Sequence, residues 1–310
     1  MALPSSGPLS MSQIQGEFGG SNPISLSEYY GVAAGVPTSG TISISNFYGK
    51  SNAVAISASG GSVTTSGGYR YHTFTGNGTF TVNSIAQGSA SNTLQVFMVA
   101  GGGGSTWNGG GGGGGGQVRL QNINATVGAK SVTIGGGGNA TSAGSVVATG
   151  QPGGTTTFTG ASSAAGGKGG DNAYVTGRWF RGGDSGGGTA SGNSPYRPGA
   201  PAWASSGGAG HGGSSPTANL SSAGSTGGNG YTLSGWTAAV SRTQYAGGGG
   251  GCVVNSNNFG AGVYGGGNGA VGNYDTAAAG ATNSGGGGGG GVLTGANKGG
   301  SGIVIVRYQV

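Results

Sequence analysis

Near the start of the chain, apolar and polar residues recur in a short pattern. Three copies place an apolar residue directly before a serine, and these apolar residues are Leu9, Ile24 and Ile42. A second apolar residue follows four positions after each serine, at Ile14, Tyr29 and Phe47. Gln13 and Glu28 stand three positions after Ser10 and Ser25, which is the spacing of a helical capping box. The pattern therefore predicts short helices of one or two turns.

The third copy fits two structures. It matches the helical pattern, but Thr41–Ser45 also alternates polar and apolar residues as a strand does. Gly31 and Gly49 follow the second and third copies, where glycine can end a helix in a left-handed conformation. About 50 residues bury too little surface to be very stable alone. We therefore expect residues 1–50 to form a small module that docks onto a partner or packs against the rest of the chain.

From about residue 52 onward, the pattern becomes that of β-strands. Residues 71–75 and 79–82 flank Gly76-Asn77-Gly78, which predicts a hairpin with a glycine-bearing loop. Residues 93–100 (TLQVFMVA) and 302–308 (GIVIVRY) are apolar runs with the length of a buried strand. Shorter β-prone runs lie between them, at residues 117–120, 131–134, 145–148 and 155–158. We expect strands at about 69–99 and 302–309 to frame a domain that spans residues 52–310.

Glycine runs separate these strands, at residues 101–104, 109–116, 135–138, 247–251, 265–267 and 285–291. Such low-complexity sequence is usually disordered, because it buries too little apolar surface to offset chain entropy. Glycine runs can instead form polyproline II helices with three residues per turn. Without a Cβ, several such helices can approach closely and hydrogen-bond to one another. All nine prolines lie outside the long runs, which favours the ordered bundle, since there every residue must donate.

The fold class that follows is mainly β with irregular parts. A small β-sheet scaffold carries a bundle of polyglycine II helices, and a small N-terminal domain with short helices precedes it. The segments between the glycine runs then become loops at the ends of the bundle.

These segments hold the large side chains of the domain. Residues 171–206 combine aromatic and arginine side chains, and residues 231–245 carry more of them. Exposed aromatic rings beside arginine, asparagine and serine are typical of recognition surfaces. The candidate binding residues are Tyr174, Arg178, Trp179, Phe180, Arg181, Tyr196, Arg197, Trp203, Trp236 and Tyr245. The alternative is that these rings cover the glycine bundle as a small core.

Composition restricts the chemistry of this chain. Glycine makes up 83 of the 310 residues, and only 5% of the residues are charged. The five carboxylates, two histidines and single cysteine show no metal-ligand spacing, so we expect no metal, no cofactor and no enzymatic activity. The 11 lysine and arginine residues give a net charge of +6 but form no basic run. This argues against nucleic-acid binding, whereas attraction to anionic cell-surface sugars stays open.

One apparent catalytic motif is discounted. The string Gly183-Asp184-Ser185-Gly186-Gly187 matches the sequence around the nucleophile of chymotrypsin-like proteases. That chemistry needs a histidine base held by a buried carboxylate. His72 lies in a predicted strand and His211 in a glycine-rich segment, and neither has the surrounding sequence that the protease family requires.

Both ends of the chain resemble known proteins. Residues 37–50 (PTSGTISISNFYGK), with the opening MALPSSGPLS, resemble N-terminal segments of virion structural proteins of tailed phages, cyanophages in particular. Residues 74–82 (FTGNGTFTV), 96–104 (VFMVAGGGG) and 299–308 (GGSGIVIVRY) are similar to the glycine-rich domain of many phage tail proteins. The architecture is also similar to the tail-tip adhesins of T-even-type phages, in which a polyglycine II bundle displays variable receptor-binding loops.

The resemblance implies a phage tail-fibre or tail-tip adhesin that is made in the host cytoplasm and located in the virion. It implies that residues 1–50 bind other tail proteins and that the candidate residues bind a host-surface glycan or an outer-membrane receptor. A homotrimer is the habit of phage fibres. The T-even-type adhesins have a different N-terminal attachment domain, so the mode of attachment does not follow from them.

Two alternatives remain beside the adhesin. The first is a purely structural tail, baseplate or fibre component without receptor binding. The second is a non-viral glycine-rich binding protein, such as an ice-binding bundle. That protein would need a flat, regular face of small residues, and the bulky segments of this chain argue against it.

Overall fold

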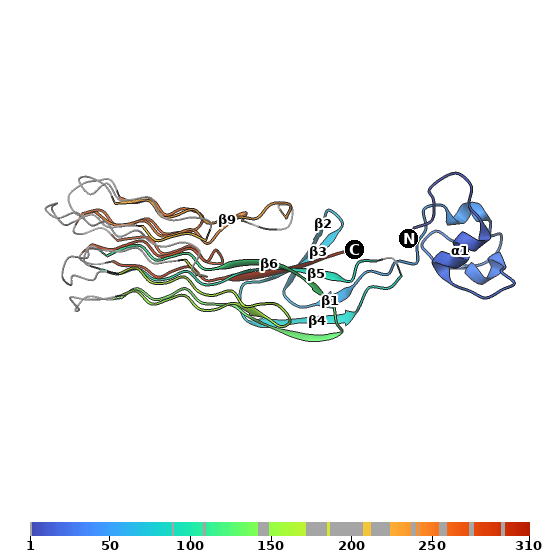
Figure 1. Cartoon of the computed structure of the whole chain (residues 1–310), viewed down its shortest axis with the longest axis horizontal. Coiled ribbons are helices and arrows are strands. Elements are labelled where there is room, and N and C mark those ends of the chain that lie inside the picture. Colours follow the sequence, from blue (N-terminus) through green and yellow to red (C-terminus); the bar gives the residue numbers. More distant parts are fainter. Residues whose placement is uncertain are drawn as a thin grey trace.

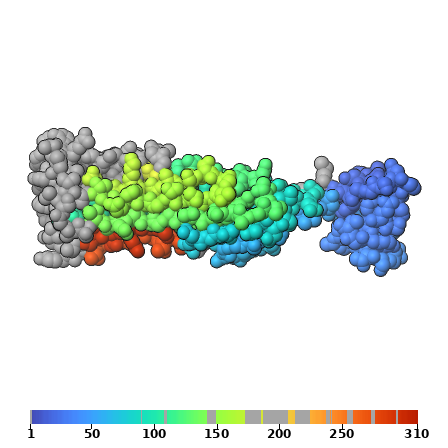
Figure 2. Space-filling model, turned by 90° about the horizontal axis from the view of Figure 1, so that it is seen from below, coloured from blue at the N-terminus to red at the C-terminus, as the bar shows by residue number. Residues whose placement is uncertain are grey.

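The computed structural model shows an elongated molecule with a small lobe at one end (Figure 1). It describes residues 2–88, 90–107, 110–141, 149–171, 185–186, 207–211, 224–236, 240, 242–253, 259–272, 276–292 and 295–310. The lobe is formed by the N-terminal residues, and a narrow neck joins it to the long body (Figure 2). No helix in the described part of the chain is long and apolar enough to span a bilayer.

Three short helices build the lobe: α1 (Met11–Phe18) and the 3₁₀ helices η1 (Leu26–Tyr29) and η2 (Ile44–Phe47). The capping boxes with Gln13 and Glu28 are present in α1 and η1, as the spacing predicts. In η2 the side chain of Asn46 accepts from the amide of Ser43 at 2.8 Å. The third copy of the repeat is therefore helical and not a strand, because this cap satisfies its first amide while Phe47 turns into the core.

The apolar residues of the three copies meet in one core. Ile14, Tyr29 and Phe47 are buried there, and the residues that precede the caps pack against them. The rings of Tyr29 and Phe47 meet edge to face with centroids 6.0 Å apart. The amide of Leu3 donates to the carbonyl of Lys50 at 2.8 Å, so the two ends of the lobe close on each other. The lobe thus has an apolar core of its own.

Two antiparallel sheets form the part of the body nearest the lobe. The five-stranded sheet has the order β2–β3–β11–β5–β6, and the four-stranded sheet has the order β1–β4–β7–β8. The first contains β2 (Ser62–Ser66), β3 (Tyr69–Phe74), β11 (Ile303–Gln309), β5 (Thr93–Val99) and β6 (Val118–Asn124). The second contains β1 (Ser57–Ser59), β4 (Gly78–Ser84), β7 (Gly128–Thr133) and β8 (Thr157–Phe158). The fold is mainly β, and the long apolar runs are confirmed as β5 and β11, which pair centrally.

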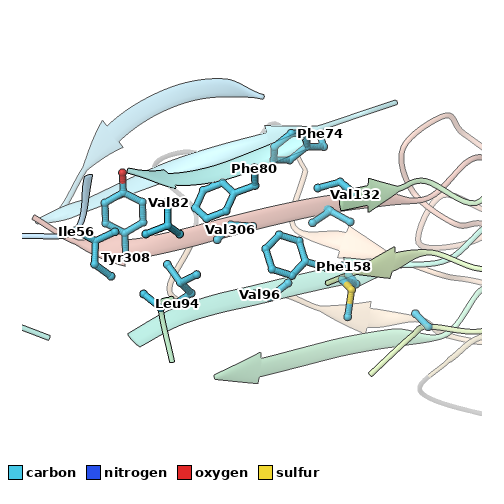
Figure 3. Packing of buried hydrophobic residues seen from close by; sticks show 14 of the residues in the cluster. Ile56, Phe74, Phe80, Val82, Leu94, Val96, Val132, Phe158, Val306 and Tyr308 are labelled. Carbon is cyan, nitrogen blue, oxygen red and sulfur yellow. The ribbon is translucent and has the colours of Figure 1, made fainter. Parts of the chain in front are cut away.

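The hairpin predicted around Gly76-Asn77-Gly78 is wrong. The strands β3 and β4 flank this turn, but β3 pairs with β2 and β11, whereas β4 pairs with β1 and β7. The turn carries the chain from one sheet to the other, so Phe74 and Phe80 both lie in the space between the sheets (Figure 3). The alternation of polar and apolar residues in β3 and β4 is the same for a hairpin and for a connection between two sheets. The chain forms the connection between sheets because this buries the rings of both Phe74 and Phe80.

The two sheets pack face to face around this apolar core. Val96 and Val306 of the five-stranded sheet lie against Val82, Val132 and Phe158 of the other sheet (Figure 3). The core holds β5, β6, β7, β8 and β11 in place. Glycine-rich segments directly follow β5 and β7 and directly precede β6, β8 and β11, so the sheets fix where these segments begin and end.

The glycine runs continue from the sheets as parallel and antiparallel rods (Figure 1). The amides of Gly101 and Gly104 donate to the carbonyls of Gly154 and Gln151, so a step of three residues along one run is a step of three along its neighbour. The two amides between them donate to two other runs. Three residues per turn is the repeat of the polyproline II helix. The described runs are therefore polyglycine II helices, as the sequence predicts.

The interior of the bundle has room only for backbone. The run at residues 101–106 is hydrogen-bonded to six neighbouring segments, at residues 110–117, 138–141, 150–154, 166–170, 285–291 and 295–300. A Cβ added to Gly103 would lie 2.0 Å from the carbonyl oxygen of Lys168, and one added to Gly287 would lie 1.8 Å from that of Gly113. Real Cβ atoms essentially never come closer than 3.0 Å to such an atom, so this packing requires glycine.

Candidate functional site

The rods of the bundle end together, at the end of the body farthest from the lobe (Figure 1). Isolated β-bridges lie there, between Thr106 and Thr141, Thr149 and Asp171, and Val253 and Val271. A small buried cluster beside them consists of Cys252, Ala270, Ala277 and Val292. We call this region, from the bridges to the buried cluster, the distal end.

Residues 172–206, which hold most of the candidate residues, start and stop at the distal end. Between these ends the chain returns to the bundle, because Ser185 and Gly186 are buried near the start of β6 and the amide of Gly186 donates to the carbonyl of Gly115. Asp171, just before residues 172–206, forms one of the bridges. Gly207, just after them, donates to Oγ of Ser225, whose carbonyl accepts from the amide of Gly251 beside the buried cluster. Eight candidates lie in this segment and outside the described residues: Tyr174, Arg178, Trp179, Phe180, Arg181, Tyr196, Arg197 and Trp203.

The other two candidates, Trp236 and Tyr245, are buried far from the distal end. The short strands β9 (Tyr231–Thr232) and β10 (Gln244–Tyr245) pair and cover the outer face of the five-stranded sheet. Trp236 is 2% exposed and Tyr245 is 1% exposed, and Phe97 contacts both rings, with centroids 6.1 and 5.0 Å away. Burial raises the pKa of Tyr245 to about 12. These two side chains therefore pack a core and do not belong to an exposed binding surface.

Arg307 on β11 connects the β9–β10 segment, which covers the outer face of the five-stranded sheet, to that sheet. Its guanidinium carbon lies 4.1 Å from the ring centroid of Trp236 and 4.4 Å from that of Tyr69, which is cation–π geometry. The same group donates to the carbonyl of Gly235 at 2.6 Å and to Oε1 of Gln95 at 2.6 Å. The sequence gives no sign of this arrangement, because its members come from β3, β5, β11 and the β9–β10 connection.

His72 is a structural histidine of the core between the sheets. Its Nδ1 lies 2.7 Å from the carbonyl oxygen of Gly60, and its Nε2 lies 3.2 Å from the hydroxyl of Tyr308. Because a carbonyl can only accept, Nδ1 carries the proton and Nε2 accepts from the tyrosine. Burial lowers the pKa of His72, and the positive charge of Arg70 lowers it further, against the opposing effect of the Gly60 carbonyl.

His211 lies near the protease-like string but is bound to the backbone. Its Nδ1 accepts from the amide of Val118 at 3.3 Å, and its ring also bonds the backbone of Gly186. Burial lowers the pKa of His211, as does the positive charge of Arg119. A catalytic histidine needs one nitrogen for a carboxylate and the other for the nucleophile. The ring of His211 bonds backbone groups instead, of Val118 and Gly186, so these hydrogen bonds hold the local structure together.

The two histidines make stability depend on pH. Since the pKa of each is lower in the folded protein than in the unfolded chain, the unfolded chain binds more protons once the pH falls through about 6.5. We expect the free energy of unfolding to be highest above that pH and to decrease toward about pH 5, by at most about 1.4 kcal/mol per pH unit for each histidine. Urea denaturation at several pH values measures this. His211→Gln should show a smaller decrease than the wild type, and a free energy that is constant over this range would contradict the prediction.

Two sheets that extend into polyglycine II helices define a class of glycine-rich β protein, and comparison with known proteins identifies the family. Residues 73–309 match the family described as a glycine-rich domain. The match covers more than half of the chain, which therefore belongs to this glycine-rich domain family. It runs from within β3 to the end of β11, so it includes all the rods, and the N-terminal lobe lies outside it. A search of curated proteins found no match.

Proposed function

We propose that this protein is a structural component of a phage virion, a tail-fibre or tail-tip adhesin without enzymatic activity. In this proposal, segments between the polyglycine II helices bind the host cell surface, and residues 1–50 bind other tail proteins. One observation carries the proposal: the segment with eight of the candidate residues begins and ends at the distal end, opposite the lobe. Binding residues are often found in loops that a rigid scaffold positions.

The shape of the molecule supports this division of roles. The lobe and the distal end are at opposite ends of the long axis (Figure 1). A protein that links a particle to a cell needs its two contact surfaces far apart. The lobe has its own buried core, so it can present an attachment surface without help from the bundle.

The distribution of charge supports an anionic receptor. Residues 1–50 contain Lys50, Glu17 and Glu28, which sum to −1. Residues 52–310 contain the other ten of the 11 basic residues and three aspartates, which sum to +7. Three of these arginines are candidate residues: Arg178, Arg181 and Arg197. Residues 172–206, with these three arginines and Asp184, sum to +2 and would attract acidic host-surface glycans or the acidic surface of an outer-membrane protein over about a Debye length.

Two tryptophans test the proposal. Trp179→Ala and Trp203→Ala should weaken binding of the full-length protein to host cells without lowering its melting temperature, because aromatic rings in a recognition segment contribute contact area and not core packing. Cell binding is measured with labelled protein, and thermal stability by circular dichroism. The alternative is a purely structural tail component, for which neither the wild type nor the variants would bind cells. Saturable binding that both variants retain would instead exclude residues 172–206 as the surface.

A further inference from the structure

The strand β2 leaves one edge of the five-stranded sheet uncovered. It ends the strand order, and four of its five residues are exposed, from Ser62 to Thr65. No hydrogen bond between described residues reaches the outer side of β2. The opposite edge strand, β6, is covered instead. There Nε of Arg119 donates to the carbonyl of Ser163 at 2.8 Å, and the side chain of Gln121 exchanges two hydrogen bonds with the backbone of Ser162.

The edge of β2 also lacks the features that usually keep such edges apart. Natural edge strands carry charged residues, proline or bulges, or are very short. The sequence Ser62-Val63-Thr64-Thr65-Ser66 contains no charge and no proline, and its register with β3 is regular over all five residues. Its β-branched residues favour the extended conformation. An edge of this kind is suited to receive another strand.

The turn after β2 determines which backbone groups point outward. Gly67 and Gly68 have φ angles of +58° and +77°, as in a type I′ hairpin with a two-residue loop. In such a hairpin the closing pair, here Ser66 and Tyr69, exchanges hydrogen bonds. Antiparallel pairs then alternate, so the amides and carbonyls of Val63 and Thr65 point away from β3 toward the open edge.

We propose that β2 pairs with β2 of a second copy of this chain, antiparallel and around a two-fold axis at Thr64. In this register Thr64 lies opposite Thr64, Val63 opposite Thr65, and Ser62 opposite Ser66. The residues that point their backbone outward, Val63 and Thr65, are then the ones that face each other. Each such pair exchanges two hydrogen bonds, and the two sheets of five strands become one sheet of ten across the dimer.

The chemistry of the edge favours a second copy over a different partner. The register places serine opposite serine and β-branched residues opposite each other, and its central pair, Thr64 with Thr64, is of a kind that stabilises sheets. No charged residues of β2 meet, because β2 has none, and the charged residue in register with β2 on β3 is Arg70, opposite Thr65. Three strand spacings, about 14 Å, would separate it from its copy, which is beyond the Debye length. Val63 is 50% exposed and would be covered by Thr65 of the other copy. This proposal does not depend on the proposed function.

Charge substitutions on the two-fold axis test the proposal. Sedimentation equilibrium of the full-length protein should show a dimer. Thr64→Lys and Thr64→Glu should each raise the dimer Kd at least about tenfold, because the axis places each charge against itself. An equimolar mixture of the two variants should recover the dimer, since lysine then faces glutamate. The control is Thr133→Lys, at an exposed position on β7, which should leave the dimer unchanged.

A proline substitution tests the hydrogen bonds separately. Val63→Pro removes an outward amide without removing a bond to β3, so it should dissociate the dimer while the melting temperature of the monomer stays the same. A wild type that is monomeric at about 100 µM, well above the Kd of a stable complex, would overturn the proposal. So would a dimer or trimer that survives both Thr64→Lys and Val63→Pro, or a Lys–Glu mixture that stays monomeric.

Discussion

Gly113→Ala should lower the free energy of unfolding by about 3 kcal/mol, the upper end of the usual cost of overpacking. The added Cβ would lie 2.0 Å from the carbonyl oxygen of Gly103, and backbone cannot turn away as a flexible side chain can. The amide of Gly113 donates to Gly288, and its carbonyl accepts from Gly249. Moving the run aside would therefore strain both of these hydrogen bonds. Chemical denaturation monitored by circular dichroism measures the loss.

Gly136→Ala is the matched control in another run. A Cβ at Gly136 would meet no atom within 4 Å, and the residue does not have a positive φ angle. Alanine there restricts the unfolded chain, so the variant should be as stable as the wild type or more stable by about 0.4–1 kcal/mol. Equal losses for the two variants would mean that glycine is needed for flexibility and not for close packing.

Trp236→Ala should destabilise the protein by about 3–5 kcal/mol, as other buried tryptophans do when truncated. The substitution removes the ring that Tyr71 and Phe97 contact, and it takes from the guanidinium of Arg307 the nearest of its three aromatic rings. The β9–β10 cover would then be held on Phe97 by Tyr231 and Tyr245 alone among its aromatic rings. The melting temperature and the urea midpoint measure the effect.

Trp236→Phe is the control for this site, because it keeps an aromatic ring against Arg307 and should cost less than the alanine variant. The comparison with Trp179 and Trp203 is the sharper one. We expect truncation of Trp236 to change stability, and truncation of the other two to change cell binding. A Trp236→Ala protein with wild-type stability would contradict the burial of this ring.

Features with a local cause could be predicted from the sequence. The caps of α1 and η1 need only a serine and a glutamine or glutamate three residues later, and Phe47 follows the same spacing. The strands β5 and β11 are apolar on both faces because the two faces of the five-stranded sheet are both covered. The polyglycine II helices follow from the lack of side chains, since only their mutual hydrogen bonds can order such runs.

Features that depend on distant contacts could not be predicted. The sequence Gly76-Asn77-Gly78 is compatible with a hairpin and with a connection between two sheets. Only the packing of Phe80 against the opposite sheet distinguishes these two structures. Trp236 has the sequence context of a loop. A weak signal was present nearby, because Leu233 and Tyr245 are apolar residues beside short β-prone segments, and both are buried with Trp236.

The step of three residues gives each run the equivalent of a reading frame. Inserting one glycine would turn every later amide of that rod by about 120°, so it would point at the wrong neighbour. Inserting three would restore every direction and lengthen the rod by about 9 Å. Lengths within the bundle can therefore change only in units of whole turns, and neighbouring rods must change together.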